Sequence, residues 1–184
     1  MILRHEAATA LVATAALVNT NDGRNDLVSD VAALNDLARS LPLSPRQECD
    51  ASDLREVRDL RPRLRQLWFA REKQVIDIVN ELLRDFSALP QLVRHDAYEY
   101  HVHVVPLDGP LAAHLAVEAA MAVADLLCLG ELNRLRSCGV PECTRVLVDL
   151  SRNRSKRYCD VRCSNRAAVI AYRTRAASVR RAVT

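Results

Sequence analysis

Four cysteines near the C-terminus constrain the fold of this chain more than any other feature. They form two close pairs, Cys138 with Cys143 and Cys159 with Cys163, and a fifteen-residue spacer between the pairs is long enough for a hairpin. Such an arrangement suits a tetrahedral zinc ion, because each pair binds the ion from one short turn. Two disulfides or four unrelated buried thiols are the alternatives. We favour one structural Zn2+ ion, since four thiolates leave no position open for a catalytic water.

The residues around the ligands predict a small zinc-binding module. A short β-type run at 146–150 is followed by a polar, basic stretch at 151–157, and a helix-favouring, alanine-rich segment begins near Val161. A cysteine knuckle, a hairpin and a helix whose first turn carries the last ligand make a treble-clef or zinc-ribbon-like module. So small a unit buries little apolar surface, and metal binding would supply much of its folding free energy.

Charge is divided unevenly along the chain. Residues 134–184 carry 13 basic and three acidic residues, a net charge of +10, whereas residues 1–133 carry 13 basic and 20 acidic residues, a net charge of −7. A basic module on an acidic body indicates that the module meets a polyanion. Two other uses stay open: one or two arginines can offset the −2 charge of a zinc ion held by four thiolates, and others can pack on the acidic body.

Basic residues of this module fall in the stretch between the ligand pairs and along the predicted helix. In that helix Arg162, Arg166 and Arg173 recur at spacings of four and seven, so that they form one stripe able to neutralise phosphates or enter a groove. The candidate nucleic-acid contacts are Arg152, Arg154, Lys156, Arg157, Arg162, Asn165, Arg166, Arg173 and Arg175. Among them, Asn165 is a candidate base-edge or phosphate contact.

The motif around the cysteines is similar to that of a known protein family. The Cys-x4-Cys pair is followed by an aspartate, a Ser-Arg-Asn-Arg run, a basic Tyr-Cys and a final Cys-Ser-Asn-Arg. In this order of motifs, residues 138–175 resemble the bacterial CGNR zinc-finger proteins. The matching residues are Asp149, Ser151, Arg152, Asn153, Arg154, Ser155, Arg157, Tyr158, Cys159, Cys163, Ser164, Asn165, Arg166, Ala167, Tyr172 and Arg173. Ser164 stands where the family has a glycine, which would carry a modest cost if that glycine serves a positive φ or a close approach to backbone.

The upstream part of the chain extends this resemblance. Residues 17–20, Leu-Val-Asn-Thr, and the helical pattern that follows are similar to the family's N-terminal ABATE domain. The resemblance implies a bacterial, stress-related transcription regulator. Its ABATE-like domain, residues 1–133, would sense a small-molecule effector or mediate association, for instance as a homodimer. Its zinc finger, residues 134–184, would contact DNA.

The fold class expected for the whole chain is mainly α (α+β), because residues 1–133 predict a helical domain with a small β-hairpin. The helical patterns cover, in order, 7–20, 31–41, 52–86 and 111–129. Ser29 or Asp30 should cap the second helix, and Pro62 should break or kink the third. The arginines of that third pattern predict either a solvated face with local ion pairs or an anion pocket. The fourth pattern is apolar nearly all round, as expected for the central helix of the domain.

Residues 91–105 change to a period of two, which is typical of a half-buried strand. Residues 92–93 would form the partner strand of a hairpin. On the polar face of 98–104 lie Glu99, His101 and His103, which could hold a second metal ion. Strand alternation alone also produces such a polar face.

Enzyme chemistry has little support. The chain has four glycines and no phosphate-binding glycine loop, no Gly-x-Ser-x-Gly elbow and no His-Glu-x-x-His helix. A DNA-binding regulator is therefore the favoured class. The alternatives are an RNA-binding or protein-interaction module and a ligand-binding or enzymatic body, which would show a deep pocket between the 52–86 helices and the 98–105 strand. Charged residues interrupt 111–129, so we expect no membrane span. Free thiolates at a zinc site fit a reducing compartment, so we expect a cytoplasmic location.

Overall fold

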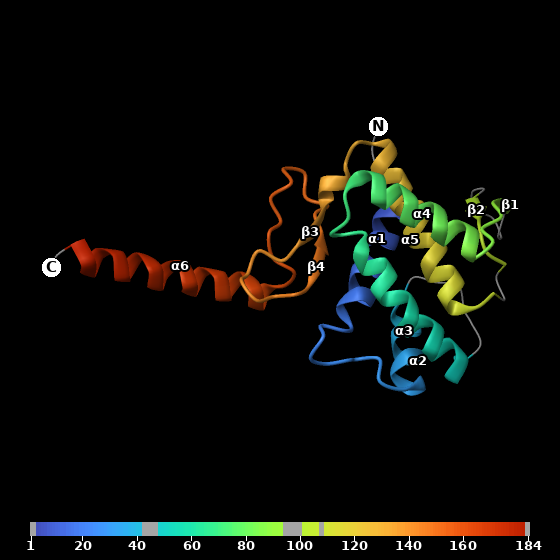
Figure 1. Cartoon of the computed structure of the whole chain (residues 1–184), viewed down its shortest axis with the longest axis horizontal. Coiled ribbons are helices and arrows are strands. Elements are labelled where there is room, and N and C mark those ends of the chain that lie inside the picture. Colours follow the sequence, from blue (N-terminus) through green and yellow to red (C-terminus); the bar gives the residue numbers. More distant parts are fainter. Residues whose placement is uncertain (1–2, 42–47, 94–100, 107–108, 183–184) are drawn as a thin grey trace. The chain divides into compact units, whose positions relative to one another are not determined.

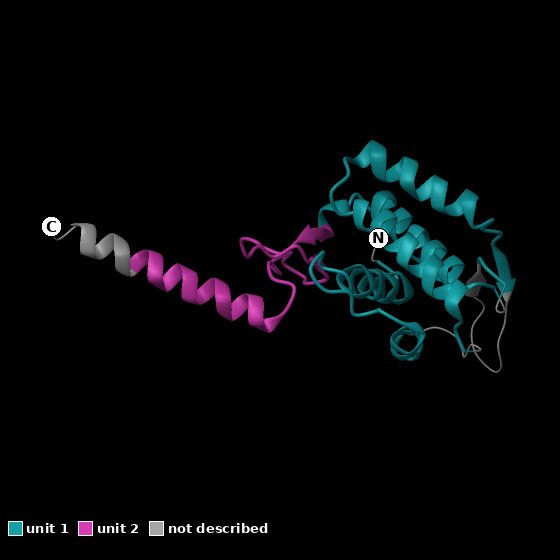
Figure 2. Cartoon of the chain, turned by 60° about the horizontal axis from the view of Figure 1, so that its bottom comes forward, with its two compact units in different colours: residues 1–133 teal, residues 134–184 magenta. Residues whose placement is uncertain are grey.

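The computed structural model describes residues 3–41, 48–93, 101–106 and 109–182. The elements, in chain order (Figure 1), are α1 (His5–Asn19), α2 (Val31–Ser40), α3 (Ala51–Gln66), α4 (Glu72–Asp85), β1 (Gln91–Val93), β2 (His101–His103), α5 (Leu111–Cys128), η1 (Leu132–Arg134), β3 (Leu135–Ser137), β4 (Val146–Val148) and α6 (Val161–Ala182). They form two compact units, residues 1–133 and 134–184 (Figure 2). The fold is mainly helical, with small antiparallel hairpins, as the sequence predicts.

Helix α5 is the centre of the first unit. Eleven of its residues are buried, all of them alanine, valine or leucine, and it packs against α1, α3 and α4. Its many alanines let the neighbouring helices approach closely. By length and composition α5 could also cross a membrane, but 61% of it is buried inside the structure, as in the core helix of a folded domain. The prediction of a central apolar helix is confirmed.

Aspartates set the starts of two of the surrounding helices. The carboxylate of Asp30 accepts the backbone N–H of Ala33 at 2.9 Å and caps α2, so that Asp30 and not Ser29 is the cap residue. At α3, Asp50 and Asp53 form a capping box in which each side chain accepts the other's backbone N–H. These bonds satisfy N–H groups that have no partner inside the helix.

Of the break or kink predicted at Pro62, the break is absent from α3. The helix continues from Ala51 through Pro62 to Gln66, and the chain leaves helical geometry only at residues 67–71, before α4 begins. Proline removes one backbone donor from the helix. However, Pro62 lies on the exposed side, where water can bind the carbonyl that lost its donor, while Leu60 and Leu64 anchor the buried side. The interruption of the 52–86 pattern therefore falls about one turn after the proline.

The predicted hairpin of the first unit is present. Strands β1 and β2 pair antiparallel, with Leu92 opposite Val102 and Gln91 opposite His103. Residue Glu99 and the side chains of His101 and His103 lie outside the described part of the structure. The alternative of a second metal site at these three residues therefore stays a hypothesis beside the favoured interpretation of a polar strand face.

The hairpin of the second unit surrounds the first cysteine pair, whereas the sequence suggested a hairpin between the two pairs. Strand β3 precedes Cys138, strand β4 follows Cys143, and the two strands pair antiparallel with Arg136 opposite Leu147. Residues 151–157 form a loop with no strand of their own. The physical reason is that a buried aspartate, Asp149, takes the backbone N–H groups that a partner strand would otherwise bind.

Candidate metal centre and basic surface

The first ligand pair lies on a tight turn between β3 and β4. The N–H of Cys138 donates to the carbonyl of Arg145 at 2.9 Å, and the N–H of Cys143 donates to that of Val140 at 3.1 Å. Glu142 adopts a left-handed conformation, with φ of 66°, which turns the chain back before Cys143. These bonds direct both thiols to the same side of the turn.

The second ligand pair belongs to the start of α6. Asp160 is the N-cap: its carboxylate accepts the N–H of Cys163 at 2.7 Å and pairs with Arg145 at 3.1 Å. An aspartate at this position is favoured because it satisfies an unpaired N–H of the first turn. The same bond lowers the pKa of Asp160, so that its carboxylate stays charged at the helix start. Cys163 therefore lies in the first turn of α6, and Cys159 lies directly before the cap residue.

The four sulfur atoms have the spacing of a tetrahedral zinc site. All of them lie within 4.8 Å of one another, with 3.9 Å between the sulfurs of Cys143 and Cys159 and 3.7 Å between those of Cys143 and Cys163. Zinc–thiolate bonds of about 2.3 Å at tetrahedral angles place sulfurs about 3.8 Å apart. The donor set and these two distances fit one zinc ion.

The protonation behaviour of the thiols also fits a cation-binding cluster. Burial raises the pKa of Cys163 to about 11, and burial together with the neighbouring thiols raises the pKa of Cys159 further. Burial opposes ionisation of Cys138 too, but hydrogen bonds from the backbone N–H groups of Val140 and Cys159 outweigh it and lower the Cys138 pKa. A cation is needed to hold all four as thiolates, because thiolates so close together repel one another.

A small apolar core surrounds the cluster. Val140 and Leu147 are buried beside Cys138, and Tyr158 and Ala167 pack against them. Gly139 approaches the backbone closely: its N–H donates to the carbonyl of Arg157 at 2.8 Å. This apolar core is too small to be stable alone. Metal binding by the four cysteines is therefore expected to supply most of the unit's stability.

One buried carboxylate organises the basic loop, which we define as residues 151–157. Asp149 is 0% exposed, and it accepts the N–H of Ser151 at 3.0 Å, the hydroxyl of Ser151 at 2.5 Å and the N–H of Lys156 at 3.0 Å. The guanidinium of Arg136 lies 3.3 Å from the same carboxylate. Burial opposes its ionisation, yet the bonds from Ser151 and Lys156 lower the pKa of Asp149, so that it remains charged.

The predicted nucleic-acid contacts divide into a loop group and a helix group. All of them are exposed: Arg152, Arg154, Lys156 and Arg157 in the basic loop, and Arg162, Asn165, Arg166, Arg173 and Arg175 in α6. Along a helix of 100° per residue, Arg162, Arg166 and Arg173 fall within about 40° of one another, as predicted, and we call them the basic stripe. Arg175 lies about 160° from the centre of that stripe and is therefore not a member of it.

Arg157 and Arg166 are among the arginines that also have partners within the unit. Arg166 reaches Glu142 of the cysteine turn at 3.3 Å, and both side chains are exposed. The guanidinium of Arg157 lies 5.8 Å from the ring centre of Tyr158. Exposed pairs of this kind contribute little to stability, so Arg166 can exchange Glu142 for another anion at small cost.

Ser164, which replaces the family's glycine, is accommodated without strain. It lies in the first turn of α6, is exposed, and donates its N–H to the carbonyl of Asp160 at 3.1 Å. The described residues with positive φ do not include Ser164. A glycine is therefore not required here by the backbone conformation, and serine is the better helix former.

Comparison with protein families identifies both parts of the chain. The CGNR zinc finger matches residues 134–176. The ABATE family, described as "Putative stress-induced transcription regulator", matches residues 6–130, which is more than half of the chain. The chain belongs to the ABATE family. No curated protein matches it. Neither ABATE nor the CGNR zinc finger is an enzyme class, and the CGNR match together with the cysteine geometry assigns one structural zinc ion to this ABATE protein.

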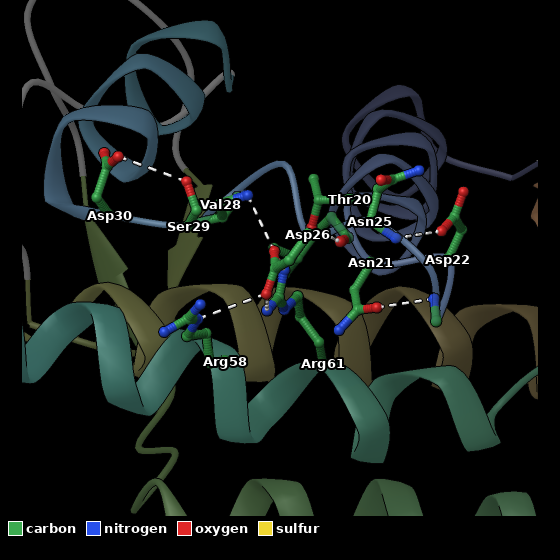
Figure 3. Close-up of polar contacts among 12 residues, drawn as sticks. Thr20, Asn21, Asp22, Asn25, Asp26, Val28, Ser29, Asp30, Arg58 and Arg61 are labelled. Carbon is green, nitrogen blue, oxygen red and sulfur yellow. Dashed lines mark hydrogen bonds and ion pairs between the residues drawn. The ribbon is translucent and has the colours of Figure 1, made fainter.

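The ABATE-matched region contains an ion pair with a buried arginine that the sequence did not reveal (Figure 3). Arg61 of α3 is 4% exposed, and its guanidinium donates to both carboxylate oxygens of Asp26 at 2.6 Å and to the hydroxyl of Thr20 at 2.9 Å. Arg58 lies 3.5 Å from the same carboxylate. The Leu-Val-Asn-Thr motif thus ends α1 and supplies a partner for Arg61. These arginines bind residues far away in the chain, which corrects the expectation of local ion pairs.

The same part of this ABATE protein has an open groove between the end of α3 and α4. Its volume is about 600 Å³, and the lining combines the apolar side chains of Phe69 and Ile78 with the charged side chains of Arg65, Asp77 and Glu81. Phe69 is 61% exposed. The lining residues come from α3, α4 and the turn that joins them, so the groove differs from the deep pocket bounded by helix and strand that a ligand-binding body was expected to show.

Proposed function

We propose that this ABATE protein is a zinc-dependent, DNA-binding transcription regulator whose zinc finger contacts the DNA. The observation that supports the proposal best is the arrangement of exposed cations on one small unit. The basic loop and the basic stripe present seven exposed basic side chains from a unit of net charge +10. Clustered arginines of this kind neutralise phosphates and hold a protein on a duplex.

The structure of the finger suggests how the surface is kept in place. Cys163 in the first turn of α6 and Cys138 on the turn after β3 are ligands of one ion, so that metal binding joins helix and hairpin. Loop and helix cations then need little reordering on contact with DNA, which reduces the entropic cost of binding. Asn165, on the exposed side of α6 next to Arg166, is the proposed contact to a base edge or a phosphate.

A binding titration with metal control tests the proposal. The purified protein is assayed for zinc per chain and titrated onto mixed-sequence duplex DNA at several salt concentrations, with and without a strong chelator. We expect affinity to fall steeply with salt as counterions are released and to be lost with the metal. Salt-insensitive binding, or equal binding after chelation, would contradict the proposal. Preference for single-stranded or duplex RNA would move the function to the RNA-binding alternative.

A second candidate function concerns the groove between α3 and α4. Its exposed apolar ring next to charges of both signs suits a small amphipathic effector. We propose that the ABATE unit senses such a ligand there or, without one, mediates association with a second copy. Thermal shifts with a metabolite panel, compared between the wild type and Phe69→Ala, test the first idea. Mass measurement in solution tests the second.

We also propose a cytoplasmic location, because the four ligand thiols must stay reduced to bind zinc. Fractionation of cells with an antibody against the chain checks this proposal. Recovery of the protein from an oxidising compartment would contradict it.

A further inference from the structure

The basic loop is held at both ends by the same buried group. The carboxylate of Asp149 binds the backbone N–H of Ser151, where the loop starts, and the N–H of Lys156, near its end. Ser151 adds an inner brace, since its carbonyl accepts the N–H of Arg154 at 3.2 Å and its hydroxyl accepts the N–H of Ser155 at 2.9 Å. These bonds account for the loop's conformation, including the left-handed φ of 51° at Arg154.

The contacts of Asp149 are all internal. With 0% exposure, its side chain cannot reach a ligand in solvent. The neighbouring guanidinium of Arg134 bonds to the carbonyls of Asp149 at 2.8 Å and Ser151 at 3.3 Å, which fixes the backbone at the start of the loop from the other side. Burying a charge costs free energy, which hydrogen bonds and a paired cation must offset. The bonds of Asp149 to the loop therefore have an energetic role.

We propose that Asp149 is a positioning residue for polyanion binding: it sets the conformation in which the basic loop presents Arg152, Arg154 and Lys156 to nucleic-acid phosphates, although it touches no phosphate itself. This inference rests on the proposed DNA-binding function. The basic loop then contributes to DNA affinity in addition to α6, although the residue that sets its conformation carries a negative charge.

The sign of one substitution separates positioning from simple charge. Asp149→Asn removes a negative charge beside a basic surface, so electrostatics alone predicts tighter binding. Positioning predicts weaker binding, because an amide has one acceptor oxygen where the carboxylate uses two, and the bonds to Ser151 and Lys156 cannot both persist. Glu142→Gln is the matched control: it removes the same charge from an exposed residue that does not hold the loop.

The first measurement is affinity for mixed-sequence duplex DNA at fixed low salt, with zinc content measured for each variant. We expect Asp149→Asn to bind about tenfold more weakly, which corresponds to the loss of one or two phosphate contacts. Glu142→Gln should bind as tightly as the wild type or more tightly. Ser151→Ala changes no charge and should weaken binding by a smaller factor. It decides the question if Asp149→Asn fails to retain zinc.

The second measurement needs no nucleic acid. Trypsin cuts after Arg and Lys, and the basic loop offers four exposed sites, at residues 152, 154, 156 and 157. We expect cleavage within 152–157, identified by mass spectrometry, to be at least several times faster in Asp149→Asn and Ser151→Ala than in the wild type and Glu142→Gln. Unchanged cleavage, or DNA binding by Asp149→Asn as tight as the wild type, would overturn the inference. If the wild type binds no nucleic acid while the cleavage rates differ as expected, the proposed function fails and the loop-setting role of Asp149 stands.

Discussion

The N–H of Gly139 donates to the carbonyl oxygen of Arg157 at 2.8 Å, which joins the turn carrying the first two zinc ligands to the last residue of the basic loop. A Cβ atom at residue 139 would lie 3.1 Å from that same oxygen and 3.6 Å from the ring of Tyr158. The cysteine turn and the loop are thus in direct backbone contact, and a change at one is transmitted to the other.

We expect Gly139→Ala to weaken zinc retention. The added methyl group must push the loop backbone away, and overpacking of this kind costs about 1–3 kcal/mol. Competition with a chelator should therefore show zinc affinity lower by about tenfold or more, since 1.4 kcal/mol is a factor of ten. Ser164→Gly is the control, because this exposed helix position should cost only about 0.5 kcal/mol. Equal zinc affinity in the two variants would contradict the close contact.

Loss of the buried arginine should destabilise the ABATE unit strongly. Arg61→Ala leaves Asp26 without its main partner, and loss of hydrogen bonds to a charged group of this kind costs about 2–3 kcal/mol, because Asp26 is 24% exposed and keeps Arg58 at 3.5 Å. Its neighbour Arg63 pairs with Asp85 at 2.6 Å on the surface, so Arg63→Ala should cost less than about 1 kcal/mol. Urea unfolding followed by the fluorescence of Trp68, the single tryptophan and a buried residue, reports on this unit alone. If both variants lost a similar amount of unfolding free energy, the contacts of Arg61 with Asp26 and Thr20 would have no special role in stability.

The same pair predicts a pH dependence of stability. The hydrogen bonds from Arg61 lower the pKa of Asp26 from 3.8 to about 2 in the folded chain. A lowered folded-state pKa stabilises the protein fully above about pH 4, and this contribution, about 2 kcal/mol, is lost as the pH falls towards 2. Unfolding free energies of the wild type and Asp26→Asn, again by Trp68 fluorescence, should converge over that interval. A constant difference between them would argue against the assignment.

Position around α6 should decide which arginines affect DNA affinity. Arg173→Ala removes a member of the basic stripe and should reduce the slope of log affinity against log salt by about one. Arg175→Ala removes an equal charge about 160° away around the helix and should leave the slope nearly unchanged. If both variants change the slope equally, α6 binds by its overall charge and not by one face.

Much of the metal site was accessible from sequence because its determinants are local. The ligand spacing and the helical start at Val161 require only short-range geometry, and the apolar pattern of α5 similarly identifies a core helix. Of the break or kink predicted at Pro62, the break does not occur, because the proline lies on the exposed side of a helix that its buried leucines hold together. In this case packing outweighed a local rule.

The role of Arg61 could not be predicted from its neighbours. It follows Val57 and Leu60 on the buried stripe of α3, which was a usable signal, but its partner Asp26 lies 35 positions away. Asp149 shows the same limit. Its place in the motif was visible, whereas the N–H groups that it binds depend on how the loop returns to Lys156.

Zinc also bears on the secondary structure of the C-terminal segment. Of the α6 side chains that the structure describes, Cys163 and Ala167 contribute to the core around the cluster, while Val169, Ile170 and Tyr172 are exposed. Forming the first turn is the costly step of helix formation, and each later residue adds one hydrogen bond. The cap of Asp160 and the metal bond of Cys163 fix that first turn. The metal site is therefore the nucleus from which α6 propagates, and loss of zinc should shift the whole segment towards coil.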